Sequence, residues 1–196
     1  MPDTADVALA TLIGAVNKEF KKTVAAPATD AALPDPKMWI PSGIDLFDFA
    51  LSREGRGVPT GRILEILGEE SRGKSALASK IISAYQAAGG IAVLLDSEST
   101  FEKNFASTCL GVDLSRLMML EVPSLEDGFD RLTGFLEAYR ENDIQVPTVV
   151  VWDTLTAAPL RAELKGDRYA GGISQKPRLI SEWMRVTAVP MSRTLT

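Results

Sequence analysis

The sequence predicts an α/β fold with a mostly parallel sheet and helices on both of its faces. Two continuous apolar runs, 91–95 and 148–152, are typical of strands that are buried on both faces. Stretches with apolar residues at helical spacing alternate with these runs, which favours crossovers between parallel strands. A glycine-containing turn at 68–75 joins another short apolar run to one of these helical stretches.

The beginning of the chain predicts a separate helix on a linker. Over residues 4–22, Leu9, Ile13, Val16 and Phe20 share one apolar face, which could pack on its own domain or on a neighbouring subunit. Three prolines among small residues follow, and they exclude a helix or a central strand. The sequence thus divides into a helix, a linker and a core domain, at 1–24, 25–37 and 38–196.

The core is expected to alternate strands with helices, separated by glycine and proline turns. Helices are expected near 42–51, 76–85, 101–109 and 126–141. Strands are expected at 62–67, 91–95, 117–120 and 148–152.

Composition excludes several classes of protein. Of the 196 residues, 45% are hydrophobic and 24% are charged, as in globular domains. No apolar run approaches the ~18 residues that cross a membrane, and the N-terminus carries no basic segment typical of a secretory signal. A single cysteine, Cys109, fits a reducing cytoplasm, and the lack of histidine excludes histidine triads and histidine-ligated metals.

Charge is unevenly distributed along the chain. The net charge is −5, yet residues 161–193 hold seven basic and three acidic side chains. Such a basic segment on an acidic body can bind a polyanion. A solvated helix face with loop charges accounts for the same composition.

The turn at 68–75 fits the pattern of a phosphate-binding loop, G-x-x-x-x-G-K-[ST]. An apolar run before it and a helical stretch after it would aim backbone N–H groups at a phosphate. Lys74 can reach the β- and γ-phosphates, and the Ser75 hydroxyl can hold Mg²⁺. The predicted nucleotide-binding residues are Gly68, Glu69, Glu70, Ser71, Arg72, Gly73, Lys74 and Ser75.

Carboxylates follow two of the predicted buried strands. Asp153 ends the strand at 148–152, where ligands of open α/β sheets bind, so we expect it to help hold Mg²⁺. Glu98 follows the strand at 91–95 and could activate an attacking water, or it could be a helix-capping acid. Phe101 and Phe105 lie just beyond; an aromatic there could stack on adenine or belong to the core.

Taken together, these stretches resemble the RecA family of DNA strand-exchange recombinases. The resemblance comes from the order and spacing of several segments and covers about residues 9–190. Its segments are 12–20, 40–48, 57–66, 95–98, 110–113 and 151–154.

The resemblance implies roles for individual residues. It makes Glu98 and Lys74 the catalytic residues, with ATP and Mg²⁺ bound. Of the two aromatic residues beyond Glu98, Phe105 is the one that we take as the candidate for the adenine contact. It implies contacts to single-stranded and duplex DNA through a loop at 163–172 and the helix after it. The implied DNA-binding residues are Lys165, Arg168, Arg178 and Arg185. It also implies a helical filament with ATP between protomers, in which the N-terminal helix packs on the next protomer.

The chain departs from the family pattern at its end. It stops at Thr196, about where the family's next core strand begins, and an Asn-Gln sensor motif and a second DNA-binding loop are lacking. We therefore expect a C-terminally incomplete, RecA-like phosphate-loop ATPase core. Two alternatives stay open: another RecA-fold ATPase, such as a helicase or a recombination mediator, or a non-catalytic ATP-binding partner in a recombinase filament.

Overall fold

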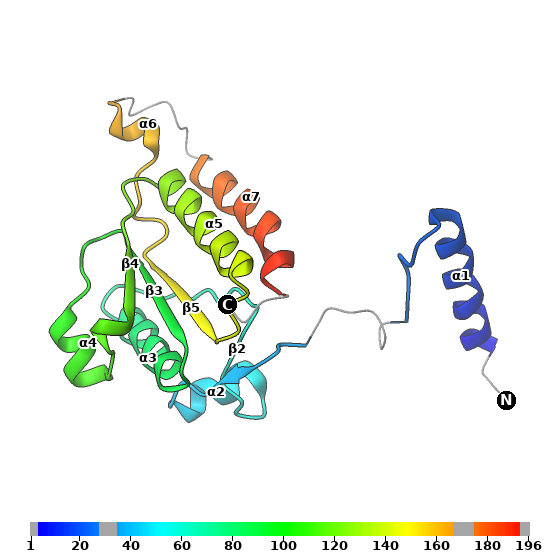
Figure 1. Ribbon diagram of the computed structural model, residues 1–196, viewed down its shortest axis with the longest axis horizontal. Helices are drawn as coiled ribbons and strands as arrows, with labels where there is room; N and C mark the ends of the chain where they lie inside the picture. The colour runs from blue at the N-terminus through cyan, green and yellow to red at the C-terminus, as the bar shows by residue number, and fades with distance from the viewer. Residues whose placement is uncertain (1–3, 28–34, 167–174, 193–196) are drawn as a thin grey trace. The chain divides into compact units, whose positions relative to one another are not determined.

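The computed structural model describes residues 4–27, 35–166 and 175–192 (Figure 1). It divides into two compact units, Met1–Asp35 and Pro36–Thr196. Most of the predicted linker, 28–34, lies outside the described residues. Within those described, every helix is too short or too polar to span a lipid bilayer.

The first unit contains one helix, α1 (Thr4–Phe20). Asn17 ends it by bonding to the chain that turns back: its Oδ1 accepts from the N–H groups of Val24 and Ala25 at 2.7 and 2.8 Å. No residue of α1 is buried. Of its predicted apolar face, Leu9, Val16 and Phe20 are exposed and Ile13 is half-buried.

The second unit is built around a parallel sheet in the order β4-β3-β5. Its strands are β3 (Ile91–Asp96), β4 (Leu117–Leu120) and β5 (Thr148–Asp153). A separate two-stranded ladder pairs β1 (Trp39–Ile40) with β2 (Val58–Pro59). The helices are α2 (Asp45–Ser52), α3 (Lys74–Ala87), α4 (Lys103–Leu110), α5 (Leu125–Glu141), α6 (Arg161–Leu164) and α7 (Gln175–Met191), with a short 3₁₀ turn η1 (Leu114–Arg116).

Helices cover both faces of this sheet, which confirms the predicted fold class (Figure 1). On one face, Ile82 of α3 and Ala106 of α4 pack with Val149 and Val151 of β5. On the other, Trp152 packs with side chains of α5 and α7. Successive β5 residues thus point to opposite helical layers, as strand geometry requires. The middle of β3, from Ala92 to Leu95, is almost completely buried.

One predicted strand is absent. The sequence predicts a strand at 62–67, but the structure assigns no strand there. Three of its apolar side chains are exposed, most of all Leu67 at 80%, with Ile63 and Leu64 near 40%, whereas Ile66 packs against the core. A β-strand needs a partner for its N–H and C=O groups, and within the described residues no ladder includes this segment. The apolar run at 62–67 was therefore not sufficient to form a β-strand.

Gly128 in α5 allows Trp152 to lie against the helix. A Cβ atom built at Gly128 would lie 2.3 Å from the Trp152 ring and 3.1 Å from Val122. Trp152 has little room to retreat, because its ring also meets Phe129 edge-on at 5.1 Å and its indole N–H donates to Ser97. Since Trp152 directly precedes Asp153, this contact sets the position of the strand end.

We expect Gly128→Ala to lower the free energy of unfolding by about 1–3 kcal/mol, because overpacking strains the core. Gly134→Ala is the matched control on the same helix, since nothing lies within 4 Å of a Cβ there. It should be neutral or stabilising by up to about 1 kcal/mol through helix propensity. Urea unfolding of both variants measures the difference. Equal stability of the two variants would contradict tight packing at Gly128.

Candidate active site

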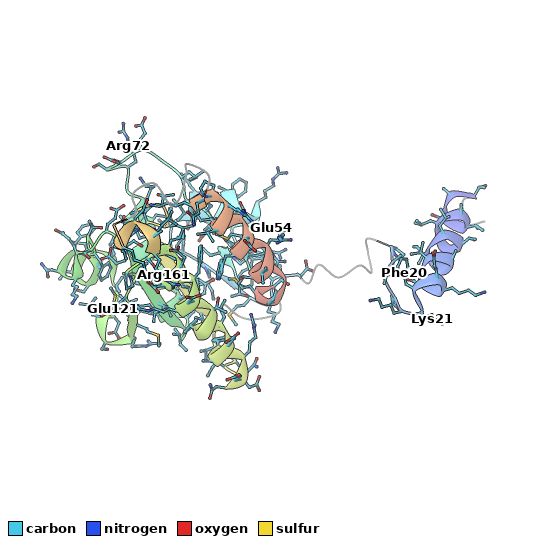
Figure 2. The ribbon with its side chains drawn as sticks, turned by 90° about the horizontal axis from the view of Figure 1, so that it is seen from above. Phe20, Lys21, Glu54, Arg72, Glu121 and Arg161 are labelled. Carbon is cyan, nitrogen blue, oxygen red and sulfur yellow. The ribbon has the colours of Figure 1, made fainter. Side chains whose placement is uncertain are left out.

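The predicted phosphate loop, 68–75, leads directly into α3, which begins at Lys74. Gly73 precedes the helix with φ of +85°, and Ser71 also has a positive φ, of +58°. These backbone angles curl the loop over the helix start, where the first N–H groups lack helical partners. Figure 2 shows Arg72 at the tip of this projecting segment, where its guanidinium donates to Glu69 at 3.0 Å.

The Lys74 ammonium folds back onto its own loop. It donates to the carbonyl oxygens of Gly68 and Glu69 at 2.9 and 2.8 Å. An ammonium has three N–H donors, so these two bonds hold the side chain along the loop and leave a third donor. The Lys74 ammonium thus lies along the loop, and its contact with a phosphate stays a prediction.

One cavity of about 210 Å³ brings several predicted residues together. Ser75 from the loop and Asp153 from the end of β5 both line it. Phe101 and Phe105 line it as well; Phe101 packs against the core, whereas 45% of Phe105 is exposed. An exposed ring at the cavity wall is available for stacking, so the structure keeps Phe105 as the adenine candidate.

Glu98 is connected to this cavity through Thr154. The Thr154 hydroxyl donates to Glu98 Oε1 at 2.8 Å and to Asp153 Oδ1 at 3.2 Å. The register of the sheet explains the contact: Asp96 of β3 pairs with Asp153 of β5, so the residues just after both strands meet. Sequence reasoning proposed both carboxylates but did not assign a role to Thr154.

Asp96 shapes the loop that carries Glu98. Its carboxylate accepts from the N–H groups of Glu98, Thr100 and Phe101 at 3.3, 3.2 and 3.0 Å. An aspartate whose carboxylate binds the backbone N–H groups that follow it favours a turn over regular secondary structure. Asp96 therefore orders the turn that carries Glu98. The N–H of the next residue, Ser97, donates to the Asp153 carbonyl at 3.0 Å and so connects this turn to β5.

The segment after β5 is anchored to the start of α5. Arg161 Nη2 donates to Asp127 Oδ1 at 2.6 Å and to Asp130 Oδ2 at 2.9 Å, and its backbone N–H donates to Glu126. Hydrogen bonding from Ser124, and then the guanidinium of Arg161, hold the pKa of Asp127 below its ordinary value. The same two acidic partners raise the pKa of Arg161.

The predicted DNA-binding residues are only partly described. Arg168 lies outside the described residues, as does most of the predicted loop at 163–172. Lys165 is exposed just after α6. Arg178 and Arg185 are exposed on α7, and their spacing of seven places them on one side of the helix. Lys176, counted with the basic segment, instead lies 3.9 Å from Glu163.

Fold and loop together define a phosphate-loop α/β core of the nucleoside-triphosphatase kind. The RecA N-terminal domain family matches residues 7–196 of the chain. The chain therefore belongs to the RecA family.

Curated relatives agree with this family. Protein RecA of Herpetosiphon aurantiacus is 30% identical over 96% of this chain and 50% of its own length. Protein RecA of a Roseiflexus species is 35% identical over 79% of this chain and 41% of its own length. Protein RecA of Chlorobium limicola is 32% identical over 93% and 49%. The chain thus spans about half the length of the curated relatives it matches.

Proposed function

We propose that this chain is the ATP-binding core of a RecA-type recombinase, which acts on DNA in homologous recombination and repair. The observation that carries the proposal is one assembly: Ser75, Asp153 and Phe105 around a single cavity, with Glu98 bonded to Asp153 through Thr154. In a RecA family member, this assembly fits ATP hydrolysis better than any structural role of the same residues.

The loop and α3 would hold the triphosphate. Backbone N–H groups at the start of a helix, together with the positive end of its dipole, favour an anion. Lys74 would exchange its two loop carbonyls for the β- and γ-phosphates. Phe105 would stack on the adenine from the cavity wall.

The donors present fit Mg²⁺. Ser75 and Asp153 offer oxygen atoms to one cavity, and Mg²⁺ is usually held by one or two carboxylates plus substrate phosphates. Among the described residues, no group of three acidic or sulfur ligands forms a larger metal cage. When bound, the ion would neutralise charge developing on the phosphates. Ser75 would hold it directly, and Asp153 would do so directly or through water.

Glu98 would orient the attacking water and accept its proton. Its side chain is exposed at the carboxyl edge of the sheet, and one of its oxygens is engaged by Thr154. The other oxygen remains to accept a hydrogen bond from water. Phosphoryl transfer is mostly positioning and charge stabilisation, so one such carboxylate can suffice.

DNA and other protomers are the proposed partners. Lys165, Arg168, Arg178 and Arg185 would contact backbone phosphates of single-stranded and duplex DNA, without reading sequence. The exposed apolar face of α1 would pack on a neighbouring copy, which gives a helical filament when the contact does not close. We propose that DNA binding and filament formation take place in the cytoplasm, where the single Cys109 stays reduced.

ATP hydrolysis by this chain, with and without single-stranded DNA, tests the proposal. DNA-stimulated hydrolysis would support a core that couples both ligands. Binding of ATP without turnover would favour a non-catalytic partner of a recombinase filament instead. Absence of ATP binding would overturn the proposed function.

Removing charge from α7 should weaken DNA binding equally for all sequences. For Arg178→Gln with Arg185→Gln, we expect the salt dependence of log K to become shallower by about 1.4, at roughly 0.7 per contact with a single strand. Salt titrations by fluorescence anisotropy, with oligonucleotides of different sequence, measure this. Arg140→Gln with Lys103→Gln removes the same charge from exposed positions elsewhere and should leave the slope unchanged. An equal effect of both pairs would exclude a local DNA contact.

A further inference from the structure

The Thr154 hydroxyl lies between the two carboxylates that the proposed chemistry uses. It donates to Glu98 Oε1 at 2.8 Å and to Asp153 Oδ1 at 3.2 Å. A hydroxyl carries a single hydrogen, so the two acceptors share it, and the shorter distance favours Glu98. Among the described residues, Thr154 is the one hydrogen-bond donor to the Glu98 carboxylate.

The backbone around this hydroxyl is held from several sides. The Trp152 indole N–H donates to Ser97 Oγ at 2.6 Å, and Asp96 holds the backbone N–H of Glu98 at 3.3 Å. The backbone of Glu98 is thus fixed relative to β5. The Glu98 side chain, by contrast, is exposed and has three rotatable bonds, so the Thr154 hydroxyl decides where its carboxylate points.

We propose that Thr154 is a positioning residue that aims the Glu98 carboxylate and couples it to Asp153. This inference rests on the proposed function and deepens it. With Oε1 engaged by Thr154, Oε2 is left to face the attacking water. If Asp153 turns an oxygen toward the metal ion, the shared hydrogen is left to Glu98 alone. Binding of the metal ion would then strengthen the hydrogen bond that orients the Glu98 carboxylate.

The hydroxyl can be removed without disturbing the turn that Thr154 begins. The Thr154 carbonyl, not its side chain, accepts from the N–H of Ala157 at 3.1 Å. Thr154→Val keeps the shape of the side chain and deletes the hydroxyl. Thr154→Ser keeps the hydroxyl and deletes a methyl group, and is the matched control.

Single-turnover ATP hydrolysis and binding of a fluorescent ATP analogue test the inference together. We expect Thr154→Val to slow hydrolysis about ten- to a hundredfold, because a misplaced catalytic group loses that much. Its affinity for the analogue should stay within about twofold, as should the rate of Thr154→Ser. In a Glu98→Gln background, Thr154→Val should add less than about twofold, because both changes act on one step.

Three results would overturn the inference: hydrolysis by Thr154→Val at the unaltered rate, a loss of affinity that matches the loss of rate, or full additivity with Glu98→Gln. If the unaltered chain binds but does not hydrolyse ATP, the catalytic proposal fails separately. Crystal structures with Mg²⁺ and a non-hydrolysable ATP analogue then decide about Thr154. A displaced or disordered Glu98 carboxylate in Thr154→Val supports the inference, and an unmoved carboxylate overturns it.

Discussion

Replacing Lys74 by alanine is expected to abolish useful nucleotide binding. The ammonium lies over the loop, 2.9 Å from the Gly68 carbonyl and 2.8 Å from that of Glu69, and loses only these bonds when it turns to a phosphate. Truncating one partner of a desolvated charge pair costs about 2–5 kcal/mol. The Kd for ATP should therefore increase by a factor between about 30 and several thousand. Titration calorimetry with ATP and Mg²⁺ measures the change.

Lys80→Ala makes the same change six residues further along α3, away from the phosphate loop, and should bind ATP normally. Both variants should keep the helix, because alanine and lysine are both good helix formers. Unchanged affinity in Lys74→Ala, with the fold intact by circular dichroism, would remove the loop from the proposed site.

Glu98→Gln is expected to separate binding from turnover. Glutamine keeps the length of the side chain and a carbonyl oxygen that can still accept from Thr154. It cannot accept a proton from water, so hydrolysis should fall by about 10²- to 10⁴-fold while ATP affinity stays nearly constant. Phosphate release measured under single-turnover conditions, beside equilibrium binding, resolves the two quantities.

Glu121→Gln is the control for loss of one negative charge at the same edge of the sheet. Glu121 follows β4 directly and is largely exposed (Figure 2). Its replacement should leave hydrolysis unchanged. Normal turnover in Glu98→Gln, or equal losses in both variants, would dismiss Glu98 as the base.

Sequence patterns that arise from neighbouring residues, such as helical spacing and continuous apolar runs, predicted most of the helices and strands. Helical spacing of apolar residues predicted a helix at 126–141, and the structure has α5 there, with Ser124 as a cap that accepts from the Asp127 N–H at 3.1 Å. Continuous apolar runs placed β3 and β5. The run at 62–67 is also rich in apolar residues but has no strand partner in the described structure, and pairing is a non-local property that composition does not encode.

The candidate site shows the same division between local and non-local signals. The phosphate loop is contiguous, so its motif could be read directly from 68–75. Thr154 could not be assigned from the sequence, because its role comes from Glu98, which lies 56 positions away in the chain and becomes a neighbour through the β3–β5 register. Asp153 could be proposed as a metal residue from the sequence because it directly follows a continuous apolar run.

Trp152 contacts both the loop that carries Glu98 and the helical layer formed by α5 and α7. Its indole N–H bonds to the loop before Glu98, and its ring contacts Phe129, which in turn stacks on Trp183 of α7 at 5.0 Å. The helix that carries Arg178 and Arg185 is thus two ring contacts from the residue beside Asp153. If a ligand on α7 shifts this aromatic stack and thereby changes ATP affinity, thermodynamic reciprocity requires ATP to change affinity for that ligand by the same factor. Such coupling would run through packed rings and would need no movement of a whole domain.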